Sequence, residues 1–141
     1  MADEGDCIFC RIVAGELPAT KVYEDPDTIA FMDIGPVVKG HTLVIPREHY
    51  NSIAETPPGV LQSVIAVVRK IARAQFAGLR ADGISVTQAN GRVAGQIVPH
   101  LHFHVIPRWG KDPAARNWAP GKYDSPGEMR DFADRIRNAV A

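Results

Sequence analysis

Three of the chain's five histidines alternate with apolar residues in one short stretch, PHLHFHVIP at 99–107. A β-strand points successive side chains to opposite faces, so a strand here would place three imidazoles on one face, roughly 6–7 Å apart: His100, His102 and His104. The residues between them would face the other way and pack into a core: Leu101, Phe103 and Val105. A helix would scatter the histidines around its circumference. The pattern therefore predicts one strand that holds a row of imidazoles above an apolar underside.

Such a row has three possible roles. Strand histidines can ligate one metal ion, as in some zinc hydrolases. A single imidazole can instead act as a nucleophile, with its neighbours serving as acid, base or phosphate donors. A structural histidine cluster accounts for the alternation equally well.

The residues directly before the row favour a catalytic role. The stretch 90–98 carries glycines at 91 and 95, which is typical of a loop. Gly95 lets a ligand approach the backbone, and the Gln96 amide offers donors and an acceptor. A hairpin loop explains the glycines but not a glutamine just ahead of the histidines. We therefore interpret this loop as an oxyanion cradle beside a nucleophile.

The row resembles the signature of the histidine triad family of nucleotide hydrolases and transferases, His-φ-His-φ-His-φ-φ with φ apolar. Residues 100–106 satisfy every position of that signature. Two further segments are similar to the family in order and spacing: Ala94-Gly95-Gln96 before the row, and Gly40–Pro46 far upstream. The resemblance spans about residues 6–108, within a single domain over 1–141 whose tail, 109–141, lies outside it.

The resemblance implies an α+β fold, with a mainly antiparallel sheet of about five strands, a long helix on one face and the nucleotide on the other. It also implies a symmetric homodimer that extends the sheet. The sequence patterns agree with this fold. They predict strands at 21–24, 28–33, 41–46 and 83–90 besides the histidine strand, and helices near 8–15, 56–78 and 125–140.

The resemblance further implies a mechanism. His102 would be the nucleophile that attacks the α-phosphorus of a nucleotide and forms a nucleotidyl-imidazole intermediate. Gln96 and His104 would stabilise the phosphate oxygens, and His41 matches a fourth active-site histidine that supports the nucleophile. The implied reaction is hydrolysis of purine nucleoside phosphoramidates, which releases AMP or GMP and needs no catalytic metal.

Nucleotide contacts follow from the same resemblance. Asp33, at the end of a predicted strand, would accept hydrogen bonds from both ribose hydroxyls. The other contacts would come from Phe9, Ile12, Phe31, Ile34, Asn90, Gly95, Gln96, His102 and His104. Ile97 departs from the pattern, because some members carry serine or threonine there to meet phosphate. Its side chain either enters the core or leaves one phosphate contact missing.

The only two cysteines form a Cys7-Ile8-Phe9-Cys10 motif, whose spacing suggests redox chemistry or half a zinc site. Cys7, Cys10, His49 and His100 together make a Cys2His2 set, which suits a closed, structural zinc site. The resemblance supports this set, because the related galactose-1-phosphate uridylyltransferases bind zinc with a similar motif, a downstream histidine and the first triad histidine.

Composition limits the partners. The 16 basic and 16 acidic residues balance, so nothing indicates a nucleic-acid or membrane partner. No apolar run approaches the roughly 20 residues of a membrane span, and the acidic N-terminus does not resemble a secretion signal, so we expect a cytoplasmic protein. In the tail, Trp109 or Trp118 would influence substrate choice if the tail reached the partner subunit's site, although ordinary packing also explains them.

Four alternatives to the phosphoramidase hypothesis make different predictions. A dinucleoside polyphosphate hydrolase shares the triad. A uridylyltransferase carries glutamine in place of the third histidine, so His104 argues against it. A nucleotide-binding or scaffolding module would bind AMP with only incidental catalysis. A metallohydrolase would hold its metal on His102 and His104 and lose activity in chelator.

Overall fold

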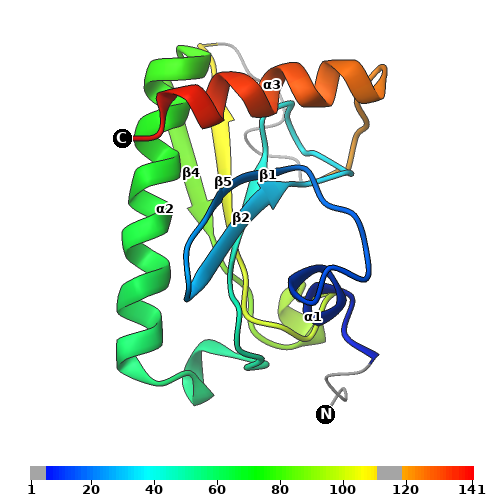
Figure 1. The fold of residues 1–141 in the computed structure, drawn as a ribbon, viewed down its shortest axis with the longest axis vertical. Coiled ribbons are helices and arrows are strands. Elements are labelled where there is room, and N and C mark those ends of the chain that lie inside the picture. The colour runs from blue at the N-terminus through cyan, green and yellow to red at the C-terminus, as the bar shows by residue number, and fades with distance from the viewer. Residues whose placement is uncertain (1–5, 111–118) are drawn as a thin grey trace.

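The computed structural model describes residues 6–110 and 119–141 (Figure 1). Its helices and strands follow the chain in this order: α1 (Ile8–Val13), β1 (Lys21–Glu24), β2 (Thr28–Met32), β3 (Thr42–Pro46), α2 (Pro58–Leu79), β4 (Gly83–Thr87), β5 (Phe103–Arg108) and α3 (Pro126–Ala139). Short 3-10 helices lie at Ile53–Glu55 and Arg92–Ala94.

The five strands form one antiparallel sheet in the order β1-β2-β3-β5-β4. The β1–β2 hairpin closes at Asp25, whose Oδ1 accepts hydrogen bonds from the main-chain N–H groups of Asp27 and Thr28, both at 2.9 Å. Such side-chain bonds are the reason that aspartate favours turns. The predicted α+β fold, with β3 at the centre of the sheet, is confirmed.

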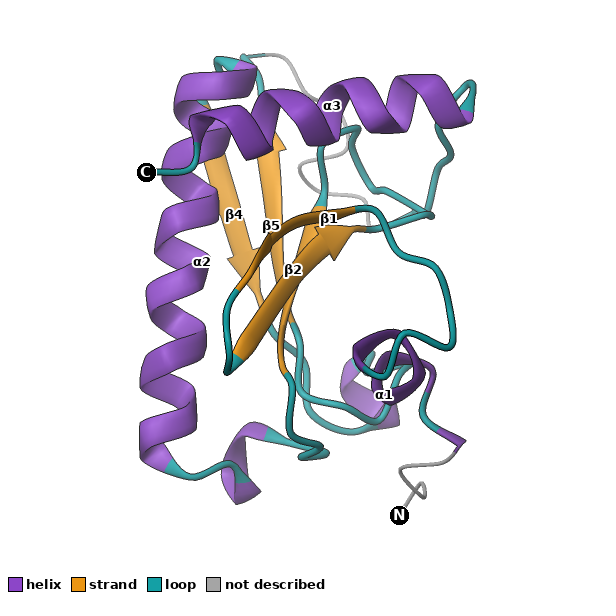
Figure 2. Cartoon of the chain, in the orientation of Figure 1, coloured by secondary structure: helices purple, strands orange, loops and turns teal. Residues whose placement is uncertain are grey.

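Helices cover the two faces of the sheet unequally. The long α2 and the C-terminal α3 lie on one side of the sheet, and the short α1 lies on the other (Figure 2). Alternate strand residues supply the two cores: Ala30, Met32, Val44, Phe103 and Val105 pack with α2. The opposite set packs with α1: Ile29, Phe31, Leu43 and Ile45. Because β5 alternates in the same way, His104 lies on the α1 face.

The prediction for the histidine row is right about its faces but wrong about the length of its strand. Leu101 lies with its apolar neighbours in the α2-side core, fully buried. The strand, however, begins at Phe103, so His100 and His102 precede it. There the main-chain N–H of Leu101 donates to the carbonyl of Tyr50, 2.6 Å away, instead of joining the regular ladder. Beside this segment, main-chain carbonyls lie against the two histidine rings: Pro46 at His100, and His100 at His102.

Helix α2 is amphipathic and buries apolar residues at three- and four-residue spacing, including Val64, Val68 and Ile71 as predicted. One polar residue, Gln75, interrupts this face and is fully buried. Its Nε2 donates to the main-chain carbonyl of Val105, 2.9 Å away, and so links the helix to β5. Among the residues described, no helix combines the length and apolarity that crossing a bilayer requires.

Candidate active site and metal centre

His102 lies at the centre of the candidate active site. Its Nδ1–H donates to the main-chain carbonyl of His100, 2.7 Å away. A neutral imidazole carries one proton, so this hydrogen bond leaves the lone pair on Nε2. The ring makes edge contacts with Phe9 and His104, at centroid distances of 5.2 and 5.0 Å. His102 therefore has the tautomer that an attacking Nε2 requires.

His41 and His104 form a connected pair beside it. The main-chain N–H of Val37 donates to His41 Nδ1 at 3.1 Å, so the proton of neutral His41 is on Nε2. This Nε2 lies 2.9 Å from His104 Nδ1, which must then accept. The proton of His104 is consequently on its own Nε2. The hydrogen-bond network thus assigns both tautomers and gives His104 an N–H next to His102.

Burial keeps these imidazoles uncharged. It lowers the pKa of His41 to about 4, and the positive charge of Arg108 acts in the same direction. Burial likewise lowers the pKa of His104 to about 3, and it lowers the pKa of His102 against the opposing effect of its bond to the His100 carbonyl. All three rings are neutral at pH 7, where a nucleophilic nitrogen needs its lone pair.

Several of the predicted nucleotide contacts line one wall beside His102. Phe9 and Phe31 are buried and meet edge to face, with ring centroids 5.4 Å apart, and Ile12 belongs to the same apolar cluster. Asp33 Oδ2 lies 3.6 Å from the Nε2 of His41, so the carboxylate adjoins the histidine pair. Ile34 follows it with an exposed side chain.

The Gln96 side chain is hydrogen-bonded within and beside the loop that precedes the histidine row. The Gln96 Nε2 donates to the main-chain carbonyls of Asn51 and Val98, at 2.6 and 3.1 Å. Its Oε1 accepts from the N–H of Gly91 at 2.7 Å. The side chain thus braces the loop, and contact with phosphate would require exchange of these bonds.

Three other residues of this loop are exposed at the protein surface: Asn90, Gly95 and Ile97. Asn90 Oδ1 accepts from the N–H of Ile53 at 2.7 Å, and its Nδ2 donates to Gln88 Oε1 at 2.7 Å. Gly95 has a φ of +103°, which favours glycine. Ile97 is 83% exposed, so its side chain does not enter the core. The hydroxyl contact that some family members have at this position is therefore missing here.

The four predicted metal ligands converge at the other end of the row. Their ligand atoms all lie within 4.8 Å of one another: Cys7, Cys10, His49 and His100. The Nδ1 of His49 lies 3.1 Å from the Cys10 sulfur, and the Nδ1 of His100 lies 3.5 Å from both sulfurs. Two thiols and two imidazoles, drawn from a stretch of sequence that runs from Cys7 to His100, thus form one cluster.

The chemistry and spacing of this cluster fit zinc. Tetrahedral zinc with ordinary Zn–S and Zn–N bond lengths separates sulfur from nitrogen by about 3.5 Å. Each histidine uses Nε2 elsewhere: His100 Nε2 lies 2.9 Å from the carbonyl of Pro46, and His49 Nε2 lies 2.9 Å from Asn51 Oδ1. Donation to these oxygens leaves both Nδ1 lone pairs facing the thiols, as outer hydrogen bonds do around metal ligands. Burial lowers the pKa of His100 to about 4, which keeps it in the neutral, metal-binding form.

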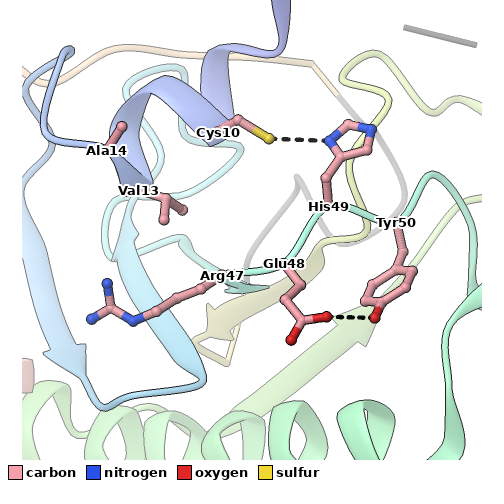
Figure 3. A pocket seen from close by; sticks show the side chains of 7 residues that line it. All are labelled: Cys10, Val13, Ala14, Arg47, Glu48, His49 and Tyr50. Carbon is pink, nitrogen blue, oxygen red and sulfur yellow. Dashed lines mark hydrogen bonds between the residues drawn. The ribbon is translucent and has the colours of Figure 1, made fainter. Parts of the chain in front are cut away.

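One side of the cluster opens to solvent. A surface pocket of about 360 Å³ has Cys10 and His49 in its wall, together with Val13, Ala14, Arg47, Glu48 and Tyr50 (Figure 3). Cys7 and His100 are buried behind them. Metal exchange and chelators would therefore reach the cluster through Cys10 and His49, on a side that does not include His102.

Sequence reasoning missed some residues that support the site. Asn51 orients His49, and its carbonyl holds Gln96, yet nothing in its local sequence marks it. Gln75 had a detectable signal, since it is a polar residue on the apolar face of a predicted helix. Of the two tail tryptophans, Trp109 packs against the α2-side core and Trp118 lies outside the described residues.

Comparison with known proteins identifies relatives over nearly the whole chain. The family model of the HIT domain matches residues 14–111. Protein hit of Bacillus subtilis is 40% identical over 138 residues, which cover 96% of this chain and 95% of that protein. Adenosine 5′-monophosphoramidase hnt1 of Schizosaccharomyces pombe is 35% identical over 134 residues, which cover 95% and 98%. A solved structure of a zinc-bound histidine triad family protein from Mycobacterium smegmatis matches with a TM-score of 0.88 and 35% identity, over 98% of this chain and 95% of that chain.

The fold and the histidine arrangement define an α+β protein of the nucleotide-binding hydrolase class. The chain belongs to the HIT, or histidine triad, family, as the family model and the full-length relatives show. The resemblance drawn from the sequence motifs is confirmed.

Proposed function

We propose that this protein hydrolyses purine nucleoside phosphoramidates through a covalent nucleotidyl intermediate on His102. The observation that carries the proposal is the hydrogen bond from His102 Nδ1 to the His100 carbonyl, which directs the Nε2 lone pair of a neutral imidazole outward from the backbone. The 35% identity to a yeast adenosine 5′-monophosphoramidase over nearly the full length supports the choice of substrate class.

In the proposed reaction, His102 Nε2 attacks the α-phosphorus and the bond from phosphorus to the leaving nitrogen breaks. The His104 Nε2–H donates a hydrogen bond to the negative phosphoryl oxygens, and the departing amine takes its proton from solvent, because neutral His104 carries only this one proton. Water then attacks the nucleotidyl-imidazole, releases the nucleoside monophosphate and regenerates His102. Asp33 binds the ribose hydroxyls, and Phe9, Ile12, Phe31 and Ile34 contact the base or sugar.

The remaining predicted phosphate contacts belong to the loop. Gly95, which lacks a side chain, lets phosphate approach the main-chain N–H groups. Gln96 and Asn90 reach the nucleotide after exchanging their present partners, Asn51 and Gln88 among them. His41 keeps His104 in its donating tautomer.

We further propose that the cluster of Cys7, Cys10, His49 and His100 binds one structural zinc ion. The donor set and its spacing support this, as does the zinc-bound relative from Mycobacterium smegmatis. Zinc would join α1 to the segment that ends in His102 and would take no part in the chemical steps. Thiol ligands of this kind suit a reducing compartment, so we propose a cytoplasmic location, which cell fractionation would check.

The first experiment follows AMP release from adenosine 5′-phosphoramidate in the presence of chelator. We expect the wild type to turn over and His102→Ala to lose activity by at least about a thousandfold, because the attacking atom is gone. AMP binding and the thermal midpoint serve as controls that the variant is folded. Turnover that survives in His102→Ala would refute the nucleophile, and wild-type turnover that disappears with chelator would favour the metallohydrolase.

A dinucleoside polyphosphate hydrolase is the nearest alternative, since the missing hydroxyl at Ile97 changes the phosphate contacts. A parallel assay of diadenosine polyphosphate and the phosphoramidate separates the two functions by their kcat/KM values. AMP binding without turnover of either substrate would instead indicate a nucleotide-binding or scaffolding module.

We also propose a homodimer formed at β4, the last strand of the sheet. An edge strand offers unpaired main-chain groups to another strand. Val86 on β4 is 47% exposed, and Ile65 and Phe76 on α2 are 48% and 49% exposed, three turns apart on one side of the helix. Sedimentation should give the mass of two chains for the wild type and of one chain for Val86→Lys.

A further inference from the structure

The end of the chain reaches back to a loop that carries two residues of the active site. This loop, residues 33–41, joins β2 to β3, and has Asp33 at one end and His41 at the other. Residues 120–128, which we call the C-terminal brace, meet this loop just ahead of and into α3 (Figure 1). The family model ends at residue 111, so the brace lies outside the region that defines the family.

Two main-chain groups of the loop are bonded to the brace. The Gly121 N–H donates to the carbonyl of Pro36 at 2.7 Å, and the Gly40 N–H donates to the hydroxyl oxygen of Tyr123 at 3.0 Å. A third contact is ionic and joins the Lys39 ammonium to two carboxylates at 3.1 and 3.0 Å: Asp124 and Glu128. The brace therefore holds the loop at three points.

The Tyr123 side chain is fixed by packing against the core and α3. Its side chain packs against the α2-side core, with its ring centroid 6.0 Å from that of Phe132 on α3. Burial raises the pKa of Tyr123 to about 12, so its hydroxyl remains protonated throughout the neutral range. The position of its oxygen is thus set by the packing of α3.

The peptide that Tyr123 contacts has little room to move. Gly40 has a φ of +102°, and a Cβ there would lie 2.7 Å from Leu79 Cδ1 and 2.9 Å from Pro107 Cγ. Its carbonyl accepts from Gln75 Nε2 at 3.2 Å. Both polar groups of Gly40 are therefore bonded, and the next residue is His41, which donates to His104.

We propose that the C-terminal brace is a positioning element of the active site. Tyr123, acting through Gly40, holds the 33–41 loop so that the Val37 N–H stays on His41 Nδ1, and it thereby maintains the donor tautomer of His104. Tyr123 touches no reacting atom in this scheme. The inference deepens the proposed function and rests on it for its kinetic test, but not for its spectroscopic one.

The test compares Tyr123→Phe with Tyr23→Phe. The control also loses one hydroxyl hydrogen bond, from Tyr23 to Asp25 Oδ2 at 2.8 Å, but in the β1–β2 turn. For Tyr123→Phe we expect kcat on adenosine 5′-phosphoramidate to fall about three- to tenfold, with KM changed less than about twofold, because one hydrogen bond that positions a catalytic group is lost. For Tyr23→Phe we expect wild-type kcat.

The second readout needs no turnover. Long-range ¹H–¹⁵N spectra of the histidine rings should show His41 protonated on Nε2 in the wild type and in Tyr23→Phe, and a mixture of tautomers in Tyr123→Phe. Lys39→Met, which removes only the ionic contact, should shift the same resonances less. Wild-type kcat and wild-type tautomers in Tyr123→Phe, with or without a lower thermal midpoint, would overturn the inference. A wild type that lacks turnover would count against the proposed function, whereas the tautomers would still decide the role of Tyr123.

Discussion

Two of the proposed zinc ligands and the proposed nucleophile are histidine side chains, but they donate from opposite ring nitrogens. In the cluster, His49 and His100 donate from Nε2 to the oxygens of Asn51 and Pro46, so each Nδ1 faces the cysteines. His102 donates from Nδ1 to a main-chain carbonyl, so its Nε2 carries the lone pair. The acceptor that binds one ring nitrogen thus determines what the other nitrogen can do.

The two regions meet at His100. Its side chain belongs to the cluster, 3.5 Å from both sulfurs, while its carbonyl fixes the tautomer of His102. The His100 side chain therefore serves the proposed metal site, and its main-chain carbonyl serves the proposed nucleophile. Substitutions can separate these roles, because a change of side chain leaves the carbonyl in place.

The largest expected contrast is between His100→Ala and His102→Ala. His102→Ala should keep one zinc per chain and the wild-type thermal midpoint while losing about a thousandfold or more in turnover. His100→Ala should lose the zinc and lower the thermal midpoint, but retain turnover within about tenfold of the wild type, because the carbonyl remains. Metal analysis, calorimetry and AMP release on the same preparations provide the comparison. Equal losses of turnover in both variants would contradict the claim that the His100 side chain is not needed for turnover.

The buried histidine pair should also make the stability of the fold depend on pH. His41 has a pKa of about 4 in the folded protein and about 6.5 when unfolded, so the unfolded chain binds more protons between these values. Its contribution to stability is complete above about pH 6.5 and is lost as the pH falls to about 4, with a total of order 3 kcal/mol. His104 acts in the same direction, with a pKa of about 3.

Urea unfolding of the metal-free protein from pH 4 to 7.5 measures this effect. Other buried histidines, such as His100 and His102, titrate in the same direction, so the informative quantity is the difference between the wild type and His41→Gln. The wild-type free energy of unfolding should fall more steeply below pH 6.5 than that of the variant. Parallel curves would mean that His41 is not held neutral by burial.

The smallest expected effect concerns the outer bond of the metal cluster. Asn51→Ala removes the acceptor of His49 Nε2 and should weaken zinc binding about 10- to 100-fold, with little change in kcat. Asn138→Ala on the exposed side of α3 is a matched control. Competition with a chromogenic chelator measures both affinities. Unchanged affinity in Asn51→Ala would show that His49 is oriented by its other contacts.

Most of the fold could be predicted from the sequence, because each helix, strand and turn has a pattern within its own residues. Alternation around Val105, three- and four-residue spacing around Val64 and an aspartate turn at Asp25 each identify their own element. The strand limit at Phe103 was missed, since His102 continues the alternation although its backbone has left the ladder. Periodicity describes side-chain direction, and it contains no information about where inter-strand hydrogen bonds stop.

Only part of the candidate site could be predicted from the sequence. The motif identified the histidines, and the structure brings Cys7 and His100 together across the chain as the Cys2His2 set requires. The tautomers depend on hydrogen-bond partners such as Val37, Asn51 and Pro46, which no motif identifies. Some of these partners lie only two to four residues away, but whether they meet the ring depends on the backbone conformation of the folded loop, which the sequence pattern does not specify.

The most direct test of the division between the two regions is to trap the covalent intermediate. Wild type, His100→Ala and His102→Ala are mixed with adenosine 5′-phosphoramidate, quenched in alkali within milliseconds and digested for mass spectrometry. The account predicts an AMP adduct on His102 in the wild type and in His100→Ala, and no adduct in His102→Ala. An adduct on another histidine, or AMP release by the wild type with no adduct at any time, would contradict it.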